Sequence, residues 1–323
     1  MLSPFSIEEI FPDVARGSVR LPRRQSGSSP QSLALTLLAD YALRTRAWLP
    51  SAAIVALLVE AGVNNAGARA AISRLARRGV LESRRQGRLS YYRLTQVTVD
   101  NLLIGGRIIA SFAAHAVPWD GWWTLVAFSL PQEADATRRA LRGQLRWRGY
   151  APLYDALWVS PHPMDNACQA DLLALAQGAM TVFRARHVEL EAVASRSPIE
   201  AWDVAAIARQ YQSFIRRWGA LVPRIESGSV TGTAAVRART EVMDTYRRFP
   251  TLDPYLPVEL LPKEWPRQEA RAVFVAVYDG LAGPAQEHVR AVVDRHTPGS
   301  APGVRAHTVA ELAGIDPGPA RPA

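Results

Sequence analysis

The chain has few of the residues that mark secreted or cofactor-dependent proteins. Cys168 is the only cysteine among 323 residues, which excludes an intrachain disulfide framework and indicates a reducing compartment. Lys263 is the only lysine, and its place between Pro262 and Glu264 excludes a Walker-type phosphate loop. The six histidines are scattered without the spacing of metal ligands. We therefore expect no metal, no cofactor and no enzymatic activity.

Long hydrophobic runs are also missing. The longest apolar stretch, residues 108–117, is too short to cross a bilayer and contains a histidine. The N-terminus has no basic region followed by an apolar run, so no signal peptide is predicted. Hydrophobic residues nevertheless make up 48% of the chain, which is typical of a globular protein. The sequence predicts a cytoplasmic protein without a membrane partner.

Residues 51–94 carry the clearest structural pattern in the chain. Their first part predicts a helix, because apolar residues recur at helical spacing behind Ser51, which is a possible N-cap. Gly62 permits a tight turn, and Asn64 is a good N-cap for a second helix. The pattern therefore predicts two helices joined by a short turn.

The second helix is predicted over residues 65–78, where Gly79 ends it. Two strands follow at residues 81–85 and 89–94, and Gly87 supplies the turn between them. Helix, turn, helix and hairpin, preceded by a helix over residues 32–43, are the parts of a winged helix-turn-helix domain. In that arrangement the second helix recognises DNA and the hairpin forms the wing.

The charge is concentrated in the same region. Residues 31–95 hold ten arginines and three acidic residues, a net charge of +7 against +9 for the whole chain. A patch of this kind suits the neutralisation of DNA phosphates. A solvated basic surface on an ordinary small domain is the alternative. The confinement of the arginines to the exposed arc of one helix and to a hairpin favours DNA binding.

Later residues predict two further domains and hence an α+β fold. Residues 119–196 read as strand, helix, strand, strand, helix, strand, which is the order of a ferredoxin-like domain. Helical periodicity dominates residues 197–296. The predicted parts are a flexible N-terminal tail (1–30), a winged-helix domain (31–96), a linker helix (97–118), a ferredoxin-like central domain (119–196), a helical C-terminal domain (197–296) and a flexible C-terminal tail (297–323).

Three separate stretches, in the right order, resemble the PaaX family of bacterial transcriptional regulators. The first is "ARAAISRLARRGV" followed by "LESRRQGRLSYYRLT", at the predicted recognition helix and wing. The second comprises "WDGWWTLVAFSLP" and "LRWRGYAPLYDALWVSP" in the central domain. The third is "LPVELLPKEWP" near the end. The resemblance covers roughly residues 31–293 and leaves only the two tails.

The resemblance implies a homodimeric repressor of a catabolic operon, such as one for phenylacetic acid. Such a repressor binds palindromic operator DNA and is released by an acyl-CoA thioester, for example phenylacetyl-CoA. A ligand-independent DNA-binding activator is the alternative. A homodimer is also expected because two half-sites give more specificity than one recognition helix.

The candidate DNA-binding residues lie on the recognition helix and the wing. Residues near the start of that helix are placed to reach base edges, whereas the others hold phosphates and fix the register. The candidates for base contacts are Asn65, Arg69, Ser73 and Arg74. The candidates for phosphate contacts are Arg77, Arg84, Arg85, Arg88 and the hydroxyl of Tyr91, and Arg93 completes the set because it matches the wing of the family.

The central domain also looks like the small CRISPR-associated endonuclease of ferredoxin-like fold, so a metal-dependent nuclease is a further alternative. In that nuclease an aspartate at the end of the first strand binds the metal. This chain has Ser129 there and no carboxylate before Glu133, which removes the main ligand of a hard cation. The nuclease is therefore disfavoured.

The acyl-CoA pocket is not identified by the sequence. Two arginine groups have a suitable charge for CoA phosphates. They are Arg138, Arg142 and Arg146 at helical spacing, and Arg184 and Arg186 beside His187. The same arginines are equally consistent with solvated helix faces or with dimer contacts.

Overall fold

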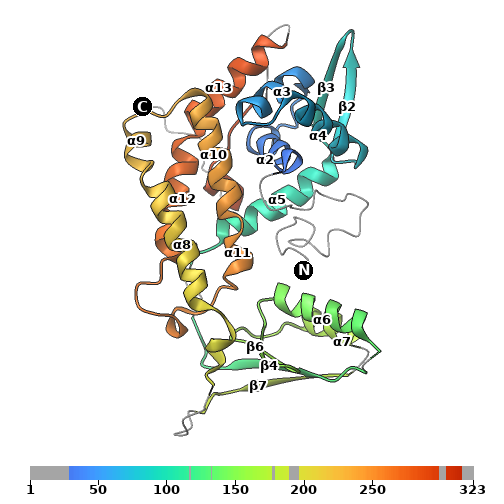
Figure 1. Ribbon diagram of the computed structural model, residues 1–323, viewed down its shortest axis with the longest axis vertical. Coiled ribbons are helices and arrows are strands. Elements are labelled where there is room, and N and C mark those ends of the chain that lie inside the picture. Colours follow the sequence, from blue (N-terminus) through green and yellow to red (C-terminus); the bar gives the residue numbers. More distant parts are fainter. Residues whose placement is uncertain are drawn as a thin grey trace. The chain divides into compact units, whose positions relative to one another are not determined.

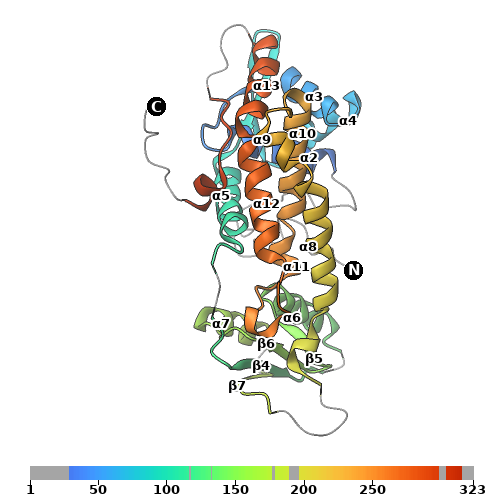
Figure 2. The same cartoon turned by 90° about the vertical axis from the view of Figure 1, so that its left-hand side faces the viewer.

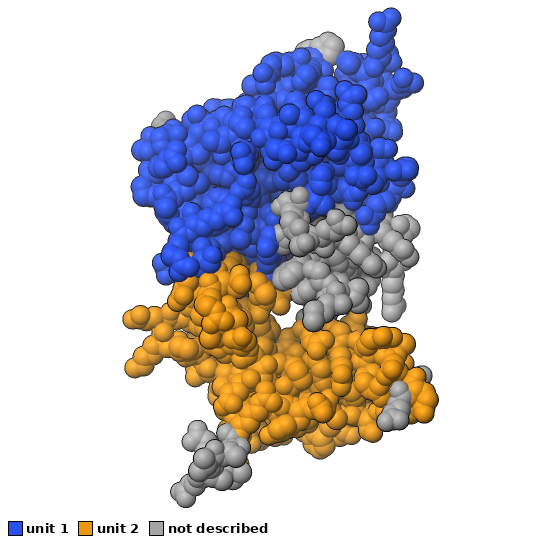
Figure 3. Space-filling model, in the orientation of Figure 1, with its two compact units in different colours: residues 1–114, 213–248, 268–323 blue, residues 115–212, 249–267 orange. Residues whose placement is uncertain are grey.

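The computed structural model describes residues 29–115, 118–131, 133–176, 179–188, 196–297 and 303–314. The chain divides into two compact units (Figure 3). Unit 1 comprises residues 1–114, 213–248 and 268–323, and unit 2 comprises residues 115–212 and 249–267. Both units combine helices with a small sheet, which confirms the predicted α+β fold. The helices of residues 197–296, which the sequence suggested as one domain, are shared between the units.

The N-terminal part of unit 1 has the order helix, strand, helix, helix, strand, strand (Figure 1). A three-stranded antiparallel sheet of order β1-β3-β2 lies beside the helices. This arrangement is compatible with a winged helix-turn-helix. The elements are α2 (Pro30–Ala42), β1 (Leu49–Pro50), α3 (Ser51–Glu60), α4 (Asn65–Arg77), β2 (Leu81–Gln86) and β3 (Leu89–Leu94).

Local sequence signals account for most of these boundaries. The Oδ1 atom of Asn64 accepts a hydrogen bond from the Gly67 N–H at 2.7 Å and caps α4, as expected. Gly62 and Gly87 adopt positive φ angles of 90° and 59° at the two turns, where other residues are strained. The predicted cap of α3 is wrong, because its N-cap is Pro50 and Ser51 is the first helical residue.

Further helices complete unit 1, and some of them pack against the helices of this N-terminal part. They include α5 (Gln96–Ser111), α9 (Val222–Glu226), α10 (Gly232–Tyr246), α12 (Arg267–Gly280), α13 (Ala282–Arg295) and α14 (Val309–Ala313). Helix α5 runs without interruption through Gly105 and Gly106. A Cβ atom at Gly106 would lie 2.9 Å from Leu312 Cδ2, so this glycine allows α14 to pack closely on α5.

The prediction of a loose C-terminal tail is wrong for residues 303–314. Thr308 and Glu311 form a capping box at the start of α14, and Val304, Val309 and Leu312 are buried. The apolar positions of this short helix find partners on α5, which a tail considered alone does not reveal. Residues 1–28 of the predicted N-terminal tail, and residues 315–323, lie outside the described residues.

Unit 2 contains the predicted ferredoxin-like domain. Its four-stranded antiparallel sheet has the order β5-β6-β4-β7, and α6 and α7 cover one face of the sheet (Figure 1). The elements are β4 (Trp123–Phe128), α6 (Asp135–Trp147), β5 (Ala151–Tyr154), β6 (Leu157–Ser160), α7 (Asn166–Leu175) and β7 (Met180–Ala185).

Apolar clusters lie on both faces of this sheet. Val126 and Trp158 pack against Leu141, Leu145 and Leu172 on the helical side. The opposite cluster is formed by Trp123, Leu153 and Val159, against which Trp202 and Leu260 pack. The short helices η2 (Pro198–Ala201), α11 (Phe249–Leu252) and η3 (Val258–Leu260) belong to this unit, and α8 (Val204–Gly219) continues from it into unit 1 (Figure 2).

Candidate nucleic-acid interface

Helix α4 separates an apolar face from a polar one. Ala68, Ala71, Ile72 and Leu75 are buried against the rest of the domain, because they recur every three or four residues. The opposite arc is exposed and carries five of the candidate residues. They are Asn65, Arg69, Ser73, Arg74 and Arg77.

The positive charge on this arc is not neutralised by the part of the chain that the structure describes. Among the described residues, none forms an ion pair, hydrogen bond or ring contact with the side chains of Arg69, Arg74 or Arg77. Helix α4 itself contains no acidic residue. Three guanidinium groups therefore face solvent from one side of a helix and are available to an anionic partner.

The hairpin extends the basic surface. Arg84, Arg85 and Arg88 are exposed on β2 and at the turn. Arg84 lies opposite Tyr91 across the strand pair, and its guanidinium group stands over the rings of Trp48 at 4.7 Å and Tyr91 at 5.3 Å. Such stacking orders a long side chain without occupying its N–H donors. Arg84 is therefore held in place with its donors free.

Arg93 differs from the other arginines of the set. Its Nε donates to Glu82 Oε1 at 2.7 Å, and the same oxygen accepts from Arg46 at 2.7 Å. The guanidinium group of Arg93 also stacks on Trp48 at 4.4 Å from the ring centroid. Arg93 is half-buried and partly neutralised, so it braces the base of the hairpin, whatever further role it has.

The structure thus brings the candidate residues together on two adjacent elements, with two differences. Tyr91 is only 5% exposed and Arg93 is half-buried, whereas the other eight are exposed. Sequence reasoning missed Trp48, whose ring is contacted by the guanidinium groups of both Arg84 and Arg93. The only sequence signal for this ring contact is that a tryptophan stands directly before the short strand β1.

The arginines suggested for CoA phosphates are largely engaged within unit 2. Arg138 donates to Asp135 and to the backbone oxygens of Leu130 and Pro131. Arg142 donates to the backbone oxygen of Asp155, and Arg184 donates to Asp120 and Thr124. The guanidinium groups of Arg146 and Arg186 stand over the rings of Trp158 and Trp122, respectively. These arginines therefore contact groups of their own domain, which the sequence analysis did not predict.

The position of the nuclease metal ligand is as the sequence indicated. Ser129 directly follows β4 and is exposed. Among the described residues, no group of three His, Cys, Asp or Glu side chains is placed to hold a metal ion. Within the same residues, no helix is long and apolar enough to cross a membrane.

Three family models match the chain in succession. Residues 29–98 match a model described as PaaX-like protein, residues 116–196 match the PaaX protein central Cas2-like domain, and residues 202–291 match the PaaX-like protein C-terminal domain. The chain is 30% identical to the transcriptional repressor PaaX of Escherichia coli (strain K12) over 246 residues, which cover 73% of this chain and 74% of that protein.

The fold has a relative among solved structures. The uncharacterized protein Rv0674 from Mycobacterium tuberculosis superposes with a TM-score of 0.55 at 20% identity, over 81% of this chain and 99% of that one. At this identity the match concerns the fold alone. The fold and the matches together define an α+β protein that joins a PaaX-like N-terminal part, a Cas2-like central domain and a helical C-terminal part. The chain belongs to the PaaX family, as the resemblance predicted.

Proposed function

We propose that the protein is a transcriptional repressor that binds a specific operator through α4 and the β2–β3 hairpin. The observation that carries the proposal is the exposed arginine surface on these two elements, where Arg69, Arg74, Arg77, Arg85 and Arg88 have no partner among the described residues. The relative named as a transcriptional repressor supports the same function. The protein acts by binding in the cytoplasm, and catalysis has no part in this function.

The candidate residues divide by position. Asn65, Arg69, Ser73 and Arg74 project from the first three turns of α4, from which side chains enter the major groove of DNA. Arg77 and the hairpin arginines supply phosphate contacts, which fix the register without reading the sequence. One such module contacts few base pairs, so we propose a homodimer that reads two half-sites.

An acyl-CoA effector is the second part of the proposal. By analogy with the family, phenylacetyl-CoA or another acyl-CoA thioester releases the repressor from the operator of a phenylacetic acid catabolic operon. Release requires that the effector binds better to a state of the dimer in which the recognition helices no longer match the half-site spacing.

Fluorescence anisotropy on DNA from upstream of the protein's own gene tests both parts. Titrations at two salt concentrations, with a scrambled duplex as control, are repeated with phenylacetyl-CoA and a panel of other acyl-CoAs. Specific binding that one thioester abolishes is the expected result. Specific binding that no thioester alters would remove the effector and keep the DNA-binding proposal. Equal affinity for both duplexes would contradict the operator proposal itself.

A further inference from the structure

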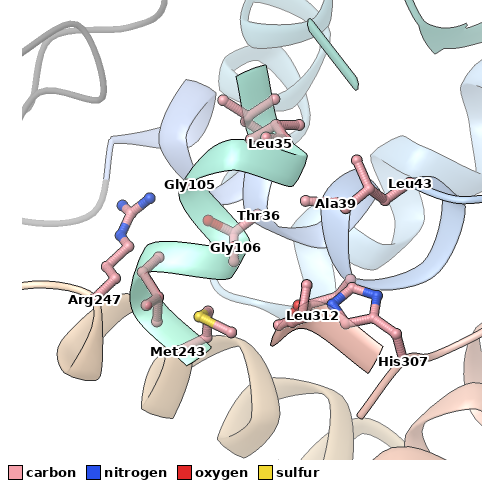
Figure 4. A pocket seen from close by; sticks show the side chains of 13 residues that line it. Leu35, Thr36, Ala39, Leu43, Gly105, Gly106, Met243, Arg247, His307 and Leu312 are labelled. Carbon is pink, nitrogen blue, oxygen red and sulfur yellow. The ribbon is translucent and has the colours of Figure 1, made fainter. Parts of the chain in front are cut away.

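A small cavity lies inside unit 1, walled by α2, α5, α10 and the C-terminal residues 307–312 (Figure 4). Its volume is about 70 Å³. Most of the wall is apolar, including Leu35, Leu43, Leu102, Met243 and Leu312. A water molecule needs about 10–15 Å³ of such space, and an engineered apolar cavity of about 150 Å³ binds benzene. The cavity therefore has room for one small ring after modest side-chain movement.

His307 is one of four polar side chains in this wall, together with Thr36, Asp40 and Arg247, and it is 4% exposed. Its Nε2 lies 2.8 Å from the Tyr278 hydroxyl, which donates its single proton to Asp40 Oδ1 at 2.6 Å. Because that proton is committed to Asp40, Nε2 of His307 carries hydrogen and donates to Tyr278. Burial lowers the pKa of His307 to about 3, so the ring is neutral. Its Nδ1 is therefore a hydrogen-bond acceptor.

The two acceptors near the cavity have no internal donor. Among the described residues, none donates to Nδ1 of His307. Asp40 also lines the cavity, and its Oδ2 atom is buried without a hydrogen-bond partner among the described residues. The two donor side chains of the wall already have acceptors. Thr36 donates to the Ser32 backbone oxygen at 3.0 Å, and Arg247 donates to Asp244 at 2.5 Å and to the Ser32 hydroxyl at 2.9 Å. The wall thus offers unpartnered acceptors, while its donors are engaged.

Positive charge around the cavity excludes a cationic occupant. The buried guanidinium group of Arg239 donates to the backbone oxygen of His307 at 2.5 Å, and Arg247 stands in the wall itself. A third cation placed beside these two guanidinium groups is repelled by both of them. A carboxylate meets the opposite difficulty, because it places a third acceptor beside Asp40 and His307.

We propose that this cavity is a binding site for a small, neutral, largely apolar molecule that carries one N–H or O–H donor. The donor bonds to the unpartnered acceptors at the His307 end, and the apolar body packs against Met243 and Leu312. This ligand differs from the acyl-CoA effector, since a phenylacetyl group has no donor. The site stands on unit 1 alone and does not depend on DNA binding.

Methionine NMR on the full chain tests the site, because the chain has only four methionines. Met243 lines the cavity, while Met164 and Met180 lie in unit 2 and serve as internal controls. Pyrrole and furan are matched probes of nearly equal shape, of which only pyrrole has an N–H donor. At pH 8, pyrrole is expected to shift the Met243 methyl signal saturably and to bind about tenfold more tightly than furan, the value of one hydrogen bond.

Two substitutions locate the binding. Ala39→Leu adds three carbons to a lining position on α2 and is expected to abolish the pyrrole-induced shift. Ala205→Leu makes the same change at an exposed position of α8 and leaves pyrrole binding unchanged.

The unaltered chain alone decides the proposal if Ala39→Leu does not fold. Equal affinities for pyrrole and furan would overturn the role of the acceptors. Absence of any Met243 shift, or shifts at Met164 and Met180 alone, would show that the cavity holds no more than water.

Discussion

Two arginine-rich regions of this protein look alike in the sequence and differ in the structure. On α4 and the hairpin, Arg69, Arg74, Arg77, Arg85 and Arg88 have no ion pair, hydrogen bond or ring contact with a described residue. On and directly after α6, a carboxylate, a carbonyl or a ring of the same domain is contacted by Arg138, Arg142, Arg146 and Arg148. Arg139 is exposed and makes no such contact with a described residue. Arginine density does not separate the two regions, but internal partners do.

The difference has a simple physical origin. The α6 arginines lie within reach of Asp135, Asp171 and carbonyl groups of neighbouring loops, so their charge is used within unit 2. No acidic residue occurs on α4. The acidic residue of the hairpin, Glu82, already accepts hydrogen bonds from Arg46 and Arg93. The charge of the first region is therefore available to a partner. Substitutions in the two regions are expected to affect different measurements.

The largest effect is expected at an arginine of unit 2 that is buried together with its counter-charge. Arg267 is 5% exposed and makes a bidentate contact with Asp253, at 2.7 Å and 2.9 Å. Arg267→Ala leaves the buried Asp253 carboxylate without its counter-charge and is expected to lower the free energy of unfolding by about 3–5 kcal/mol. Denaturant titration measures this loss. Arg138→Ala, whose partner Asp135 is exposed, is the control and is expected to cost less than about 1 kcal/mol.

An effect that depends on pH is expected at Asp40. Burial raises the pKa of its carboxyl from 3.8 to about 6, against the opposing influence of Arg239. The folded state then binds a proton more tightly than the unfolded chain does. The free energy of unfolding falls as pH rises from about 3 to 7, by about 3 kcal/mol from this group.

Asp40→Asn removes this contribution. Relative to the unaltered protein, the variant is expected to gain about 3 kcal/mol of stability between pH 4 and pH 7. Denaturant titrations at both pH values measure the gain. His307, whose pKa is lowered to about 3 by burial, acts in the opposite direction in both proteins and cancels in the difference. A difference that stays constant with pH would contradict the raised pKa of Asp40.

The sequence predicted the elements well and their partners poorly. Apolar periodicity located α2, α3 and α4, and Asn64 and Gly87 marked a cap and a turn, because these signals act within a few residues. The cluster of Asp40, Tyr278, Arg239 and His307 joins residues more than 200 positions apart, and no local pattern announces such contacts. For the same reason the sequence does not show that the arginines of α6 are engaged within their own domain, while those of α4 are exposed.

Arg74→Ala tests the base-reading role of α4. Arg74 lies on the exposed arc without a partner among the described residues, so its loss is expected to leave stability nearly unchanged. If it contacts a base edge, operator binding weakens by about 1–3 kcal/mol while binding to a scrambled duplex changes little. Anisotropy titrations on both duplexes measure the two losses. Equal losses would reassign Arg74 to a phosphate contact.

The smallest expected effects, which concern the salt dependence of DNA binding, distinguish the two arginine-rich regions most directly. Arg85→Ala is expected to weaken binding to both duplexes and to reduce the slope of log K against log salt by about 0.9, since one phosphate contact is lost. Arg142→Ala removes the same charge from unit 2, where the side chain donates to the backbone oxygen of Asp155 at 3.3 Å. It is expected to leave both the DNA affinity and the salt slope unchanged. A slope that falls equally in both variants would mean that the arginines of α6 also face DNA, and internal partners would then no longer distinguish the two regions.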